Sequence, residues 1–138
     1  MSHRYWLAAA GLTGLALAFA IGVAVGQQTP PTANKGVSVS PPTAIDLTQE
    51  LDGVAGRQLR LRLVTIEPGG VVGVHSHNGR PAVAYVIQGT LTEYREGSSG
   101  SIAHHEGESW TEGKDTTHWA ENKGDGPVVV LAVDVFKP

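Results

Sequence analysis

Two histidines, His75 and His77, stand two residues apart just after an apolar run, Val71 to Val74. On a β-strand such residues share a face, so both imidazoles would point into the same space. His118 follows about 40 residues later, at the start of another β-like segment. Neutral imidazole binds iron, manganese, nickel, zinc or copper, so the three histidines predict a divalent metal site of unknown metal identity. Spacing alone also allows two exposed strand histidines and an unrelated third.

The chain around these histidines resembles the cupin superfamily. The first cupin motif is Gly, five residues, His-x-His, three or four residues, Glu, six residues and Gly. Its counterparts here are Gly69, His75, His77, Ala82 in the place of the Glu, and Gly89.

The second cupin motif is Gly, five residues, Pro-x-Gly, two residues, His, three residues and Asn. Its counterparts are Gly107, Gly113 and Asp115 in the places of Pro and Gly, His118, and Asn122. The resemblance implies a cupin-type conical β-barrel, or double-stranded β-helix jelly roll, over residues 44–138. It also implies that His75, His77 and His118 are metal ligands, and that small barrels of this kind pair as homodimers.

Ala82 is the informative departure from the motif, because cupins usually complete the site with a carboxylate there. Glu112 or Asp115 could lend one, although the spacing does not require it. Three neutral imidazoles alone would leave the ion its full charge and favour a small anionic, chelating ligand. Some cupin dioxygenases use three-histidine iron, which implies a metal-dependent oxygenase or isomerase. The alternative is a non-catalytic ligand-binding or sensing cupin with weak or no metal, and the sequence assigns no catalytic residue.

Other residues of reactive or aromatic type have simpler interpretations. His104 and His105 are adjacent, so on a strand they face opposite ways, and solvent exposure is the expectation. Trp110 and Trp119 could line a pocket, but packing in the core or in a subunit interface explains them equally well. Tyr85 and Tyr94 are expected to pack in the core or at the barrel rim, and Asn122 to cap a turn.

The elements that must position the histidines are short strands. Leucines at 59, 61 and 63 alternate with arginines at 60 and 62, which predicts a half-buried strand. Residues 83–87 and 128–135 are apolar runs rich in β-branched side chains. Gly- and Pro-rich turn clusters, including 67–70 and 78–81, separate about eight such strands. The chain is therefore predicted to be all-β, a sandwich or barrel with almost no helix.

The N-terminal 26 residues are predicted to be a signal peptide or a membrane anchor. Residues 7–25 are apolar and uncharged, Arg4 precedes them, and small residues at Ala24 and Gly26 suit cleavage. Either outcome places the domain outside the cytoplasm, periplasmic or secreted, and held at the inner membrane if the segment stays uncleaved. Residues 27–43 hold four prolines and are predicted to be a semi-extended linker.

Composition narrows the choice of partners. The 138 residues include no Cys, which excludes thiolate nucleophiles and iron–sulfur clusters. The formal charge is −3, so binding to nucleic acid is not expected. A small-molecule ligand is the expected partner.

Overall fold

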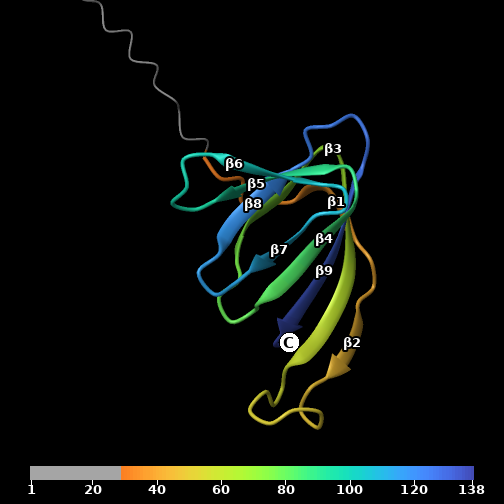
Figure 1. Cartoon of the computed structure of the whole chain (residues 1–138), viewed down its shortest axis with the longest axis vertical. Coiled ribbons are helices and arrows are strands. Elements are labelled where there is room, and N and C mark those ends of the chain that lie inside the picture. Colours follow the sequence, from red (N-terminus) through yellow and green to blue (C-terminus); the bar gives the residue numbers. More distant parts are fainter. Residues whose placement is uncertain (1–28) are drawn as a thin grey trace, which may run out of the picture.

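The chain is built from β-strands in residues 29–138, the part that the computed structural model describes (Figure 1). The proposed signal or anchor segment lies outside these residues. Within them, no helix has the length and apolarity needed to cross a bilayer. The strands are β1 (Lys35–Val39), β2 (Thr43–Asp46), β3 (Gln58–Ser76), β4 (Ala82–Gln88), β5 (Thr90–Arg95), β6 (Ser101–His105), β7 (Ser109–Glu112), β8 (Thr117–Glu121) and β9 (Val128–Phe136).

The strands pair in the order β6-β5-β8-β3-β9-β4-β7, and β1 and β2 also pair with β3. All pairings are antiparallel, and the sheet curls into a nearly closed barrel (Figure 1). The first half of β3 pairs with β9 and its second half with β8. This long strand therefore joins the two walls of the barrel, and the all-β prediction is confirmed.

The cluster at residues 67–70 was predicted to be a turn, and that prediction was wrong. Residues 67–70 are a bend inside β3, at the point where the strand leaves β9 and meets β8. Gly69 has a φ of 70°, which favours glycine. A Cβ on Gly70 would lie 2.7 Å from the carbonyl oxygen of Glu67. The glycines thus allow a sharp corner without ending the strand.

The Pro-rich stretch also differs in part from its expectation. Lys35–Val39 forms β1 and pairs with β3. The side-chain oxygen of Asn34 accepts a hydrogen bond from the backbone N–H of Gly73 at 2.8 Å. This part of the stretch is therefore part of the barrel wall, paired with β3, the strand that contains His75. The sequence analysis had predicted a linker without such pairing.

One half of the barrel interior is apolar and the other half is charged. The apolar half is a cluster of six buried side chains: Ile66, Ala84, Leu91, Ala120, Val128 and Val130. At the other end, β3 turns Arg60 and Arg62 toward the buried Asp134 of β9. The two faces of β3 are therefore the reverse of the usual arrangement. Its arginines are partly buried, while Leu59 and Leu61 are exposed. Pairing with Asp134 is what stabilises the inward arginines.

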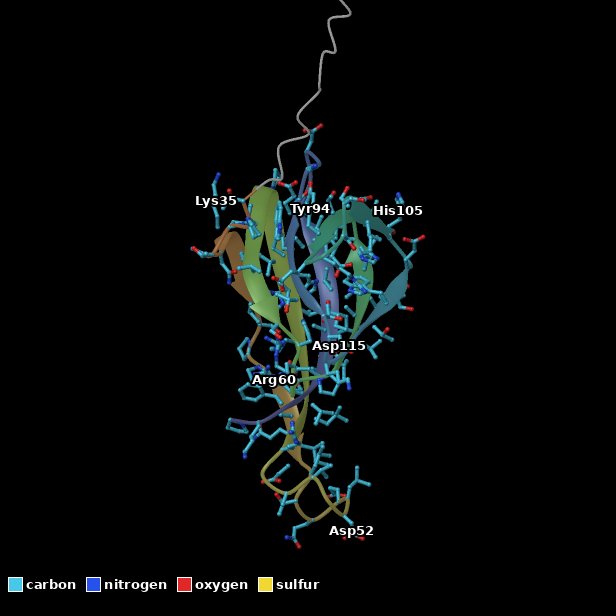
Figure 2. All side chains as sticks on the ribbon, turned by 90° about the vertical axis from the view of Figure 1, so that its left-hand side faces the viewer. Lys35, Asp52, Arg60, Tyr94, His105 and Asp115 are labelled. Atoms are coloured by element: carbon cyan, nitrogen blue, oxygen red, sulfur yellow. The ribbon has the colours of Figure 1, made fainter. Side chains whose placement is uncertain are left out.

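Beyond this charged end, β2 and the start of β3 form a hairpin that extends out of the barrel. Figure 2 shows Asp52 at the tip of this extension and Arg60 near its base, where it meets the barrel. His105 and Tyr94 lie at the opposite end of the molecule (Figure 2). The interior between these ends contains the candidate site.

Candidate metal centre

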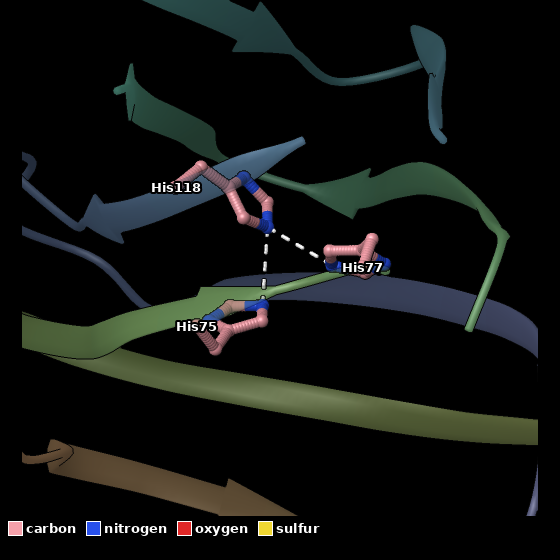
Figure 3. A group of neighbouring side chains, drawn as sticks. All are labelled: His75, His77 and His118. Atoms are coloured by element: carbon pink, nitrogen blue, oxygen red, sulfur yellow. Dashed lines mark hydrogen bonds between the residues drawn. The ribbon is translucent and has the colours of Figure 1, made fainter. Parts of the chain in front are cut away.

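The three predicted histidines come together in the barrel. His75 in β3 and His118 in β8 are direct cross-strand partners. His77 lies just beyond the end of β3, where its backbone N–H donates to the carbonyl of Thr116 at 2.8 Å. Figure 3 shows the rings converging, with Nε2 of His118 lying 3.1 Å from Nε2 of His75 and 3.1 Å from Nε2 of His77.

The opposite nitrogen of each ring defines the tautomer. Nδ1 of His75 lies 2.9 Å from the carbonyl oxygen of Gly73, and Nδ1 of His77 lies 3.1 Å from that of Arg80. Nδ1 of His118 lies 2.5 Å from a carboxylate oxygen of Glu93. These oxygens only accept hydrogen bonds, so each neutral ring carries its proton on Nδ1. Three Nε2 lone pairs are therefore directed at one another.

Such an arrangement fits a metal ion better than it fits hydrogen bonding. Two lone pairs 3.1 Å apart repel unless something positive lies between them. Metal–nitrogen bonds of about 2.1–2.2 Å at right angles would place the nitrogens about 3.0–3.1 Å apart. Nδ1–H hydrogen bonds to carbonyl or carboxylate oxygens are also the usual support of metal-binding histidines. The donor set fits a divalent transition metal.

A carboxylate reaches the histidines from the strand that pairs with Ala82. Glu112 of β7 is the cross-strand partner of Ala82. Its oxygens lie 3.2 Å from Nε2 of His77 and 3.6 Å from Nε2 of His118. The indole N–H of Trp110 donates to the same carboxylate at 3.0 Å. Of the two acidic residues that the sequence offered, Glu112 reaches the site, whereas Asp115 is exposed in the following turn.

Glu93 is a site residue that the sequence analysis missed. It is fully buried in β5 and also accepts hydrogen bonds from His104 and Arg95. Burial acts to raise its pKa, but the hydrogen bonds from His118, Arg95 and His104 outweigh burial and hold the pKa at about 2. A signal was present, because Glu93 lies two residues after Leu91 and therefore shares its inward face of the strand.

The imidazoles are held in the form that a metal requires. Burial is the main cause that lowers the pKa of His77 to about 4, although the charge of Glu112 opposes it. Burial likewise lowers the pKa of His75. Both rings are therefore neutral near pH 7, and their Nε2 lone pairs are free.

The expectation of exposure was wrong for His104 and correct for His105. His104 is buried, stacks on Trp110 with ring centres 3.9 Å apart, and contacts Glu93. His105, its neighbour on the other face of β6, is exposed. Trp110 lines the cavity and also packs against the apolar core cluster. Asn122 has the expected role in a turn, where its amide braces the loop before β9.

The remaining aromatic residues divide between interior and surface. Trp119 is buried and stacks on Tyr94, with ring centres 4.0 Å apart. Tyr85 is 42% exposed on the outer face of β4. Packing thus accounts for Trp119 and Tyr94, whereas Tyr85 belongs to the outer surface.

A cavity of about 300 Å³ connects the histidines to the charged end of the barrel. Its walls include all three histidines and Glu112, together with Arg62 and Arg80. Both arginines contact Asp134, at 3.0 and 2.9 Å. Burial acts to raise the pKa of Asp134, but the surrounding arginines outweigh burial and lower it. The cavity is therefore lined by histidines and a carboxylate at one end and by arginines at the other.

The match to a protein family agrees with this geometry. The family described as the cupin domain matches residues 62–134, which is more than half of the chain. The chain therefore belongs to the cupin domain family. A comparison with curated protein sequences finds no match.

Solved structures with the same fold have low sequence identity. The protein TT1209 from Thermus thermophilus is 21% identical, with a TM-score of 0.52 over 61% of this chain and 77% of that one. An oxalate oxidase in complex with the substrate analogue glycolate is 22% identical, with a TM-score of 0.55 over 75% and 52%. The Schizosaccharomyces pombe Cnp3 cupin domain is 10% identical, with a TM-score of 0.56 over 80% and 68%. At these identities the likeness concerns the fold alone.

Proposed function

We propose that this cupin binds one divalent transition metal ion through His75, His77, His118 and Glu112, and that the ion acts on a small anionic ligand in the barrel. The observation that carries the proposal is the meeting of three Nε2 atoms whose Nδ1 atoms are already engaged. Three imidazoles and one carboxylate leave a divalent ion a net positive charge, so an anionic ligand is favoured. The ion would supply Lewis-acid or redox chemistry, as an oxygenase or isomerase needs.

The chain's own residues have distinct tasks in this proposal. Glu93 and the carbonyls of Gly73 and Arg80 hold the imidazole protons on Nδ1. Trp110 orients Glu112 through its indole N–H. The apolar half of the barrel keeps bulk water away from one side of the site, which strengthens charge interactions there.

The direct experiment is elemental analysis of the full-length protein purified without a histidine tag, followed by oxygen-uptake assays with small organic acids. One ion per chain with substrate-dependent uptake is the result expected of an oxygenase. One ion without uptake would favour the non-catalytic cupin that carries a metal and binds a ligand. Failure to retain any of the five candidate metals would contradict the proposal and favour a metal-free ligand-binding barrel.

We also propose that two copies pair through the outer face of β3, β9 and β4. Leu59, Leu61 and Leu63 are 42%, 38% and 37% exposed, and Val83 of β4 is 52% exposed on the same face. Apolar faces of this kind usually mark an interface. Sedimentation velocity should show a dimer that Val83→Arg dissociates and that Ile102→Arg, on strand β6 outside this face, leaves intact. A monomeric wild-type protein would reject the pairing.

Export is proposed from the N-terminal sequence alone. Arg4 and the apolar residues 7–25 suit a signal peptide or anchor, which would place the barrel in the periplasm, at the inner membrane or outside the cell. Fractionation with N-terminal sequencing tests this proposal. A soluble full-length chain in the cytosol would contradict it.

A further inference from the structure

The charged cluster at the far end of the cavity contains more positive than negative charge. Arg60, Arg62 and Arg80 all contact Asp134, at 2.8, 3.0 and 2.9 Å. Three guanidiniums and one carboxylate leave a surplus of two positive charges. Because these side chains are largely withdrawn from solvent, the surplus is only weakly screened and attracts an anion.

Asp134 cannot satisfy all of the surrounding donors. It already accepts four hydrogen bonds, two from Arg60 and one each from Arg62 and Arg80. A carboxylate offers about four acceptor positions. The remaining N–H groups of the guanidiniums therefore need another partner.

The three arginines differ in what they leave free. Arg60 binds Asp134 through two nitrogens and lies over the ring of Phe136, 3.7 Å from its centre. Arg62 and Arg80 each bind Asp134 through a single nitrogen, and both line the cavity, which Arg60 does not. Nε of Arg62 is buried and has no acceptor within residues 29–138. The arginines with spare donors that also line the cavity are therefore Arg62 and Arg80.

These donors lie beside the metal centre. The carbonyl of Arg80 accepts the hydrogen bond from Nδ1 of His77, and a backbone turn joins the two residues. Burial is the main cause that lowers the pKa of His75 and of His77, and the positive charge of Arg80 adds to it. A ligand in the 300 Å³ cavity can thus face both clusters.

We infer that Arg62 and Arg80 form an anion subsite that holds a carboxylate of a small organic acid, while another oxygen of the same ligand faces the metal centre. The second half of this inference rests on the proposed function. A guanidinium fork matches the two coplanar oxygens of a carboxylate. The cavity volume lies at the lower end of the range for ligand pockets, so the acid is small.

The test measures binding of malonate to the metal-free, full-length protein by calorimetry, with malonamide as its uncharged analogue. Malonate binds and malonamide does not. Arg62→Gln and Arg80→Gln each weaken malonate about 10–100-fold, the effect of losing a charged hydrogen bond. Arg60→Gln is the matched comparison, because it removes the same charge from around the same carboxylate without removing a group that lines the cavity, and it weakens malonate less than either of the other two variants.

A second variant and a second measurement keep the test decisive. If Arg62→Gln fails to fold, Arg62→Lys keeps a charge near Asp134 but loses the fork, and malonate still binds several-fold more weakly. Manganese affinity, measured in the same variants, stays unchanged. Equal malonate affinity in wild type and Arg62→Gln would overturn the subsite, as would preference for inorganic phosphate or malonate binding only to the metal-loaded form. A wild-type protein that binds malonate but no manganese would instead overturn the proposed function and leave the anion subsite supported.

Discussion

The two ends of one cavity hold buried carboxylates in opposite surroundings. At one end Glu112 faces the imidazoles of the metal centre, and Glu93 supports His118 while pairing with Arg95. At the other end Asp134 is surrounded by three guanidiniums, and the net charge is positive. The same type of side chain thus helps to build a place for a cation in one cluster and a place for an anion in the other.

The difference arises from the partners rather than from the carboxylates. Imidazole can give up its proton at neutral pH, so burial beside other imidazoles leaves lone pairs that suit a metal. Guanidinium stays charged, so three of them around one carboxylate leave unused donors. Changing one cluster should therefore leave binding at the other largely intact.

The largest expected effect is on stability at the positive cluster. Asp134→Asn removes the one carboxylate among three inward arginines and leaves them repelling one another. Breaking a buried ion network in this way costs about 3–5 kcal/mol of unfolding free energy. Urea denaturation of the variant measures this loss. A cost below about 1 kcal/mol, as for a surface pair, would show that the cluster is effectively solvated.

Next in size is the loss of metal in the histidine cluster. His75→Ala, His77→Ala and His118→Ala each remove one of three imidazole ligands and should lower metal affinity more than about 100-fold. Equilibrium competition with a metal-sensitive dye measures it, with the exposed His105→Ala as the control. Malonate binding to the metal-free variants should change little. A variant that loses malonate binding together with metal binding would contradict the independence of the two clusters.

Moving the carboxylate across the strand pair sharpens the assignment of Glu112. Glu112→Ala should weaken metal binding about 10–100-fold. Because Ala82 is its cross-strand partner, the double variant Ala82→Glu and Glu112→Ala should recover most of the loss. Ala82→Glu alone would place two carboxylates side by side, raising metal affinity while weakening an anionic ligand. A double variant no better than Glu112→Ala would mean that Glu112 is not a ligand.

Glu93→Gln should have a smaller effect on metal affinity, about tenfold. The amide no longer holds the proton of His118 on Nδ1 as a carboxylate does, so the correct tautomer is less favoured. Nitrogen NMR shifts of the His118 ring report the tautomer directly. An unchanged tautomer and unchanged affinity would reduce Glu93 to a packing role.

The mildest prediction concerns the stability of the metal-free protein in acid. The folded pKa of His77, about 4, lies below the ordinary 6.5 because burial disfavours the charged ring. Unfolding therefore takes up a proton, and this contribution is complete above about pH 6.5 and declines as pH falls toward 4. Glu93, with a pKa of about 2, loses its contribution only below about pH 4.5. The melting temperatures of wild type and His77→Gln should therefore depend differently on pH between about pH 4 and pH 6.5.

Periodicity predicted much of the fold, because alternation and turn residues are local properties. The strands over 83–87 and 128–135 follow from patterns of this kind. Spacing placed His75 and His77 on one face, whereas the resemblance to cupins was needed to bring His118 to them. The role of Glu112 depends on the β4–β7 register, which no local pattern defines. The inward arginines of β3 were missed because their partner, Asp134, lies more than 70 residues away. The bend at 67–70 was mistaken for a turn because glycines are common both in turns and in bends within a strand.

The central claim is that one ion lies among the histidines and Glu112. Crystals of the full-length protein grown with manganese, measured above and below the manganese absorption edge, test it most directly. We expect a single anomalous peak within about 2.0–2.3 Å of the Nε2 atoms of His75, His77 and His118 and beside an oxygen of Glu112. An absent peak, or a peak bound through Nδ1 or elsewhere in the barrel, would contradict it.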